Sequence, residues 1–218
     1  MPKFVRDDPE SPDPGFADLY GSLPDATDLE PWLGWCRQAR PPVLYLGIGA
    51  GRLAVPLARA DVELIGVDIH PGMLQRLRAR DRNMELIRSR IEDLDLGRSF
   101  DLVLGPSSVL ASDDCLAAAG RHSSRLLAME LMNPHWLLAG AHPSVRLAGD
   151  RLEVDYPGGY TQQAEYLPRW PEEVDGRLDT LGLDLVRLFG HGDLGLEESP
   201  TYYVLASKRL RSAQTPST

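Results

Sequence analysis

A glycine-rich turn is the part of this sequence whose residues point most directly to chemistry. Gly47, Gly49 and Gly51 follow the short apolar run 43–46, with one residue between each pair of glycines. Glycine reaches positive φ and lets a ligand touch the backbone, and a helix that begins here would offer unpaired N–H groups. A turn with a purely structural role would have a similar composition. The turn therefore indicates a ligand-binding site without naming the ligand.

Two residues near the turn narrow the choice of ligand. Arg52 stands where a dinucleotide-binding fingerprint would have its third glycine, which counts against NAD or FAD. Asp68 ends the strand-like run 64–67, and a carboxylate at the end of a second strand can accept hydrogen bonds from both hydroxyls of a ribose. The alternative is that Asp68 caps a helix beginning near Pro71. Because the strand pattern continues directly into Asp68, ribose binding is favoured, and an adenosine-containing cofactor is predicted.

Beyond these residues, the sequence resembles a known family along much of its length. Residues 43–58 look like the first motif of the class I methyltransferases that use S-adenosylmethionine (SAM), particularly those acting on small molecules. Residues 66–69 and 73–74 are similar to the second motif, and residues 100–110 resemble the fourth strand with its loop. Residues 170–208 resemble the C-terminal part of the family more loosely. The resemblance implies a SAM-dependent methyltransferase that O- or N-methylates a small organic molecule.

The resemblance also implies roles for individual residues around the cofactor SAM. Gly47, Gly49 and Gly51 would face the methionine part of SAM, and Asp68 would hold its ribose. A second set would surround the adenine and the methyl group: Ile69 and Met73 as apolar walls of the adenine, Ile91 as a backbone N–H donor to the ring, and Pro106 beside the reacting methyl group.

Two positions depart from the pattern of the family. Tyr45 stands where the family usually has an acidic residue that helps to anchor the amino group of the cofactor. Arg90 stands where an aspartate often accepts from the adenine amino group, although Glu92 or Asp93 is able to substitute. Losing a charged hydrogen bond costs roughly 1.5–3 kcal/mol. The alternative function is therefore a catalytically degenerate protein of methyltransferase fold that acts as a binding or scaffold module.

The catalytic candidates lie outside the glycine turn. Methyl transfer is an in-line displacement that depends mostly on positioning, but an acceptor hydroxyl or ammonium also calls for a general base, most often histidine. Residues 133–136 follow the expected fifth strand, at the sheet edge where ligands bind, so His135 is a candidate base and Asn133 a candidate substrate contact. An ordinary turn is the alternative. Tyr20 resembles an N-terminal tyrosine that closes over SAM, and for Glu130 a structural hydrogen bond is favoured.

The elements that must position these residues alternate between strands and helices. Short apolar runs fit strands buried on both faces, and helical spacing returns between them. This alternation predicts an α/β fold with a doubly wound, mostly parallel sheet. The family resemblance implies seven strands, the last one antiparallel. The first five strands are expected at 43–46, 63–68, 84–89, 100–105 and 125–131, and helices at 50–60, 71–80 and 112–122.

Four regions are expected along the chain. Residues 1–40 would form a loosely docked N-terminal arm and a cap helix that opens at the capping box 27–30. Residues 41–140 would be the SAM-binding, Rossmann-like core. Residues 141–168 would be an inserted antiparallel β-hairpin region that either covers the acceptor pocket or forms a dimer interface. Residues 169–218 would supply the C-terminal helix and the final strands of the core sheet.

Composition excludes several classes of partner. The net charge of −9 argues against a nucleic-acid surface, which needs concentrated Lys and Arg. No apolar run approaches the roughly 20 residues that span a bilayer. Cys36 and Cys115 lie far apart without metal-ligand spacing, so we expect no metal site and a reduced, cytoplasmic protein. The expected partner is a small-molecule substrate, and a homodimer is possible.

Overall fold

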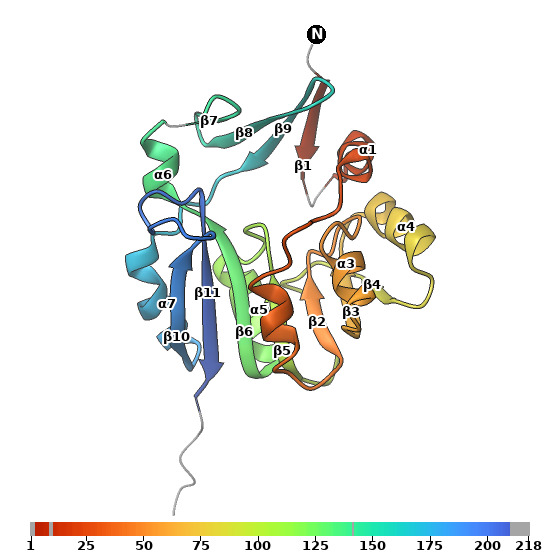
Figure 1. Cartoon of the computed structure of the whole chain (residues 1–218), viewed down its shortest axis with the longest axis vertical. Helices are drawn as coiled ribbons and strands as arrows, with labels where there is room; N and C mark the ends of the chain where they lie inside the picture. Colours follow the sequence, from red (N-terminus) through yellow and green to blue (C-terminus); the bar gives the residue numbers. More distant parts are fainter. Residues whose placement is uncertain (1–2, 9–10, 141, 210–218) are drawn as a thin grey trace, which may run out of the picture.

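The chain forms two β-sheets with helices around the larger one. The computed structural model describes residues 3–8, 11–140 and 142–209. The larger sheet has seven strands in the order β10-β11-β6-β5-β2-β3-β4, and the smaller has four in the order β1-β9-β8-β7. Figure 1 shows the smaller sheet lying across one end of the larger sheet, above the carboxyl ends of its parallel strands. The predicted α/β fold with a seven-stranded sheet is thereby confirmed.

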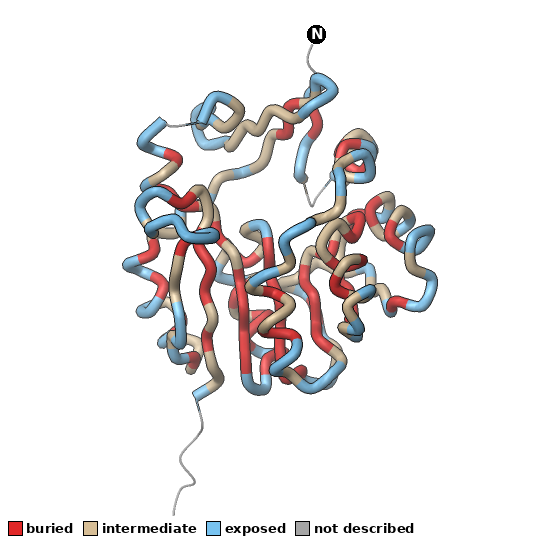
Figure 2. The backbone as a smooth tube through the Cα atoms, in the orientation of Figure 1, coloured by how far each residue is buried: buried red, intermediate tan, exposed pale blue. Residues whose placement is uncertain are grey.

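The larger sheet is parallel except at one edge. Its central strands are short apolar runs, buried along their whole length (Figure 2), because helices cover both faces of the sheet. The final strand is antiparallel to both of its neighbours, β6 and β10, as expected. The strands are β2 (Val43–Leu46), β3 (Leu64–Asp68), β4 (Glu85–Arg88), β5 (Phe100–Gly105), β6 (Ser123–Met132), β10 (Leu183–Gly190) and β11 (Thr201–Lys208).

Two apolar clusters, one on each face, hold the helices to this sheet. One cluster joins α2, α3 and α4 to the strands, and the other joins α5 and α7. Local signals start several helices: Ser112 accepts from the N–H of Cys115, and Pro71 occupies the first turn of its helix. The helices of the core are α2 (Trp32–Cys36), α3 (Ala54–Arg59), α4 (Pro71–Arg80), α5 (Asp113–His122), α6 (Pro134–Leu138) and α7 (Val174–Thr180), the last preceded by a 3-10 turn, η1 (Pro171–Glu173).

The N-terminal segment differs from the expected loose arm. Residues Lys3–Asp7 form β1, which pairs in parallel with β9 (Tyr160–Glu165), and Val5 is buried. Helix α1 (Pro14–Ser22) follows and was not predicted. The expectation was wrong because the strand depends on pairing with residues 157 positions later, as in Lys3 with Tyr160, which no local pattern reveals.

The predicted cap helix is also shorter than expected. Asp28 accepts from the N–H of Glu30 and so stabilises a turn, and the helix begins only at Trp32, after Pro31. The predicted hairpin is present as β7 (Val145–Ala148) and β8 (Arg151–Tyr156), extended by β9. Within the described ranges, no helix is long and apolar enough to cross a bilayer.

Candidate active site

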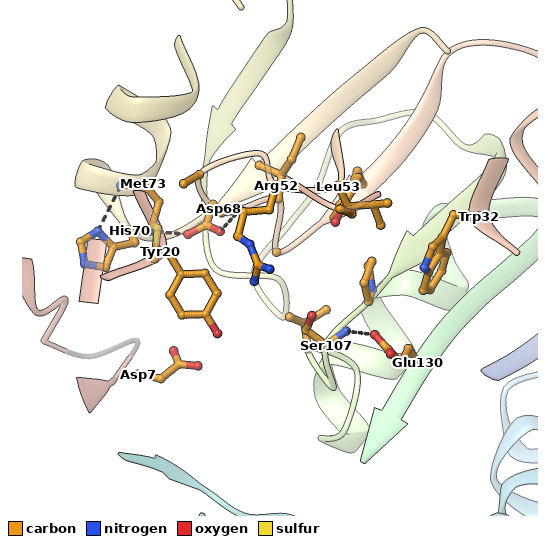
Figure 3. A pocket seen from close by; sticks show the side chains of 18 of the residues that line it. Asp7, Tyr20, Trp32, Arg52, Leu53, Asp68, His70, Met73, Ser107 and Glu130 are labelled. Carbon is orange, nitrogen blue, oxygen red and sulfur yellow. Dashed lines mark hydrogen bonds between the residues drawn. The ribbon is translucent and has the colours of Figure 1, made fainter. Parts of the chain in front are cut away.

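A cavity of about 500 Å³ lies between the two sheets, within the usual range for cofactor sites. Its floor is the carboxyl ends of β2, β3, β5 and β6, and its roof comes from β1, α1 and β9. Figure 3 shows Asp68 and Tyr20 on one side of the cavity and Glu130 and Trp32 on the other, with Arg52 between them. Residues from distant parts of the sequence therefore share one site.

The glycine turn forms part of the floor, but its three glycines have different surroundings. All three have positive φ, at +67°, +57° and +84° for Gly47, Gly49 and Gly51. A Cβ on Gly49 would meet no atom within 4 Å, so this position opens into the cavity. A Cβ on Gly51 would lie 2.4 Å from Leu77, and Gly51 does not line the cavity. Gly51 is therefore required for packing against α4, whereas Gly49 leaves room for a ligand.

Asp68 braces this turn and faces the cavity. Its carboxylate accepts from the N–H of Gly49 and the N–H of His70, both at 2.8 Å. A carboxylate offers about four acceptor positions, so capacity remains for a ligand hydroxyl. Burial raises the pKa of Asp68. The alternative role as a helix cap belongs instead to His70, whose Nδ1 accepts from the N–H of Gly72 at 3.1 Å.

The expected adenine side is only partly assembled. Ile69 and Met73 line the cavity beside Asp68, and Met73 is buried. Ile91 does not line the cavity and packs against the core of the larger sheet. Arg90 donates to Glu92 at 2.8 Å.

The roof is fastened by polar contacts to the smaller sheet. The Tyr20 hydroxyl on α1 donates to Gln162 Oε1 on β9 at 3.1 Å, and its ring packs on Phe16. Asp7, at the end of β1, is exposed and lines the cavity. Partial desolvation there, with the nearby charge of Asp68, raises the pKa of Asp7 to about 6. Tyr20 thus lines the cavity from its roof.

The opposite end of the cavity combines a carboxylate with aromatic rings. Glu130 lines this end, accepting from the N–H of Ser107 and from Thr201 Oγ1, each at 3.0 Å. The turn after β5 has φ of +55° and +62° at Ser107 and Ser108, a conformation that costs energy in non-glycine residues. Pro106, at the start of this turn, lines the cavity.

Sequence reasoning missed most of this end. Glu130 was expected to be structural, and Tyr203 and Trp32 were not considered as site residues. An acid inside an apolar strand was the available signal for Glu130. Tyr203 gave no signal because its place depends on the pairing of β11 with β6, which sets it directly opposite Glu130.

The histidine proposed as a base lies elsewhere. His135 is exposed on α6, with Nε2 3.1 Å from Glu172 Oε2, and does not line the cavity. Asn133 is fully buried, caps α6 and donates to the carbonyl of Ser199 at 2.9 Å. This segment has the ordinary turn structure that was the alternative to a catalytic role.

The residues present suit a cationic adenosyl cofactor such as SAM. The open space at Gly49 suits the methionine chain of SAM lying on the turn. The spare acceptor positions of Asp68 suit its ribose. Arg52 is available for a carboxylate. The lining is otherwise acidic, which suits a ligand carrying positive charge; its carboxylates are Asp7, Asp8, Asp28, Glu30, Asp68 and Glu130.

Comparison with known proteins agrees with this description. Residues 43–130 match the family model described as "Methyltransferase domain". The chain resembles the CcbJ methyltransferase from Streptomyces caelestis with a TM-score of 0.70 and 21% identity, covering 89% of this chain and 96% of that one. It also resembles SAM-bound CalS10, an amino pentose methyltransferase from Micromonospora echinaspora, with a TM-score of 0.65 and 18% identity over 89% and 96% of the two chains.

Together, these findings agree with the predicted resemblance: residues 43–130 match a methyltransferase domain, and the seven-stranded sheet has the fold of the solved methyltransferases. Among curated proteins, the chain is similar to aklanonic acid methyltransferase DauC of Streptomyces sp. (strain C5), with 33% identity over 93 residues. That match covers 38% of this chain and 42% of the relative, less than half of its length.

Proposed function

We propose that this protein transfers the methyl group of SAM to a small organic acceptor, on oxygen or nitrogen. The observation that carries the proposal is one cavity in which the open Gly49, the Asp68 carboxylate and the turn at Pro106 meet under a roof. Its volume of about 500 Å³ leaves room beside a cofactor for part of an acceptor. The similarity to methyltransferases of small molecules supports the same function.

Each part of the cavity has a distinct task in this proposal. Bound SAM supplies an electrophilic methyl group on a sulfonium. Asp68 holds the ribose, Gly49 gives the cofactor chain access to the backbone, and Ile69 and Met73 face the adenine. Pro106 borders the space in which the acceptor meets the methyl group. Holding the acceptor in line can supply roughly 7–11 kcal/mol, so these residues act mainly by positioning.

The roof completes the site by excluding water. Tyr20 lies over the cavity and is held by Gln162, which fixes α1 against the smaller sheet. A role for Tyr20 as a closing residue is part of the proposal. His135 is not carried forward as a base because it lies outside the cavity, beside Glu172.

The partners and the compartment of the protein are proposed from its composition and charge. The acidic cavity and the net charge of −9 disfavour nucleic acid as a partner. Two free cysteines fit a reducing compartment such as the cytoplasm. We expect no membrane partner, and a homodimer remains an expectation that sedimentation analysis would check.

Substituting Asp68 tests the cofactor site directly. Asp68→Asn removes the charge that a ribose diol would meet, and it keeps one oxygen where the carboxylate has two, one for the N–H of Gly49 and one for the N–H of His70. We expect SAM to bind about 10- to 100-fold more weakly by calorimetry, since a charged hydrogen bond contributes about 1.5–3 kcal/mol. Asp95→Asn is the control for loss of a charge outside the cavity, because Asp95 accepts from the N–H of Gly97 and does not line the cavity. No binding of SAM by the wild-type protein would refute the proposed function.

A further inference from the structure

The end of the cavity opposite Asp68 has the composition of a site for a cation. Trp32, Tyr45 and Tyr203 line it, and each is only 4% exposed. The Glu130 carboxylate lies among them. In Figure 3, Glu130 and Trp32 are on one side of the cavity, and Asp68 and Tyr20 are on the other. A ligand that spans the cavity would place one end at each carboxylate.

The fold brings these four residues together from three strands and a helix. Tyr203 on β11 pairs directly with Glu130 on β6, so both side chains lie on the same face of the sheet. The Trp32 ring meets the Tyr203 ring edge-on, with centroids 5.6 Å apart. Burial, and then the charge of Glu130, raise the pKa of Tyr45 and of Tyr203, so both phenols stay protonated close to the carboxylate.

Glu130 keeps both charge and hydrogen-bonding capacity for a ligand. Each of its oxygens has one protein donor, the N–H of Ser107 or Thr201 Oγ1, which leaves acceptor positions unused. Among the ion pairs of the described residues, none includes Glu130. A half-buried carboxylate without a cationic partner is costly, and aromatic faces attract cations as well.

The other charged groups around this end form no ion pair with Glu130 among the described residues. Arg52 lines the cavity and keeps its charge, and its Nε donates to the carbonyl of Pro24. His191 Nδ1 lies 2.8 Å from the Tyr203 hydroxyl. Asp28 and Glu30 at the rim add further negative charge.

We propose that Glu130, together with Trp32, Tyr45 and Tyr203, binds an alkylammonium group. The proposal rests on the proposed function, because the ammonium belongs either to the amino-acid end of SAM or to an amine acceptor. It also accounts for Tyr45: strand β2 lacks a carboxylate here, and β6 supplies one across the intervening strand β5. The missing acid is therefore relocated, and the site is not degraded.

The test uses Glu130→Gln, which keeps the side-chain size and an acceptor for Ser107 but removes the charge. Calorimetry compares SAM with 5′-methylthioadenosine, which lacks the ammonium-bearing end. A separate titration of n-butylammonium into protein saturated with S-adenosylhomocysteine is followed by tryptophan fluorescence. Glu153→Gln is the control for loss of a charge outside the cavity, because Glu153 is half-buried, accepts from Gln163 at 2.8 Å and pairs with Arg146 at 2.7 Å.

Two results support the proposal and identify the source of the ammonium. If SAM binds at least about 10-fold more weakly to Glu130→Gln while 5′-methylthioadenosine is unaffected, the site holds the ammonium of the cofactor. If SAM is unaffected and n-butylammonium binding is lost, the site holds an amine acceptor. The proposal is overturned if Glu130→Gln binds all the probes as tightly as wild type, or if its affinities for SAM and for 5′-methylthioadenosine fall equally. Wild-type protein that binds no SAM would instead refute the proposed function.

Discussion

At the scale of single residues, neighbouring glycines in one turn meet different needs. Gly49 has φ of +57° and open space where a Cβ would be, whereas Gly51 has φ of +84° and lies against the buried Leu77. The same residue type is therefore required for ligand access at one position and for packing at the other. Sequence alone gives both positions the same role.

Alanine substitutions should separate these two roles. Gly49→Ala should cost about 1–2 kcal/mol in unfolding free energy from the positive φ, and SAM affinity should fall more than about 10-fold because the methyl group enters the cavity. Gly51→Ala should cost more, about 2–4 kcal/mol, because overpacking against Leu77 adds to the strain. The folded Gly51→Ala protein should bind SAM nearly as tightly as wild type. Urea unfolding and calorimetry measure both effects, and equal loss of affinity in the two variants would contradict this assignment.

At the scale of elements, Asp101 ties three segments together at the start of β5. Its carboxylate accepts from Arg125 Nε on β6 at 2.9 Å and from the N–H of Arg40, just before β2, at 3.0 Å. Hydrogen bonds from Arg125, followed by those from Arg40, lower the pKa of Asp101 to about 2. Asp101 itself is buried, so the strands β2, β5 and β6 that form the cavity floor share one anchor.

The stability of this anchor should depend on pH in a predictable direction. A carboxylate whose pKa is lower in the folded protein stabilises the fold above about pH 4 and loses this effect as the pH falls toward 2. Asp101→Asn should therefore lower the unfolding free energy by about 2 kcal/mol at neutral pH, and by less as the solution is acidified below about pH 4. Urea unfolding at several pH values measures the difference. The control Asp184→Asn, which alters an exposed pair with Arg209, should change stability little. A loss of unfolding free energy in Asp101→Asn that does not depend on pH would argue against titration of Asp101 as its cause.

At the scale of the whole molecule, the roof of the site exists only because the N-terminal strand β1 meets β9, far along the chain. The N-terminal β1 pairs with β9, Tyr20 on α1 donates to Gln162, and together they cover the carboxyl ends of the larger sheet. Val5 packs with Phe16 in the cluster beneath this roof. Ligand binding and docking of the N-terminal segment should therefore be coupled.

Hydrogen exchange should reveal this coupling. Saturating SAM should slow amide exchange in β1, α1 and β9, because a ligand that binds only the closed cavity stabilises it by about 2.7 kcal/mol at 100 times its Kd. Strand β10, at the far edge of the larger sheet, should serve as the internal control, with unchanged exchange. SAM binding with no protection of β1 would mean that the roof closes independently of the cofactor.

Much of the cavity floor could be predicted from local patterns. The glycine turn, Asp68, Ile69, Met73 and Pro106 follow short strands, and in a parallel sheet the carboxyl ends of the strands lie at one edge. The exceptions have local physical causes. Gly51 and Ile91 turn toward the packed core, and the segment containing His135 forms a helix that leads away from the cavity.

By itself, the sequence determined the order of strands and helices from residue 43 to residue 131, the class of fold and the Gly49–Asp68 side of the cavity, because spacing, capping and turn residues act between near neighbours. Only the tertiary structure decided which residues form the roof of the cavity and the end opposite Asp68. The pairing of β1 with β9 made the N-terminal segment a roof, and the pairing of β11 with β6 set Tyr203 opposite Glu130. Such contacts join residues far apart in the chain, and their stability comes from shared burial, which no local pattern encodes.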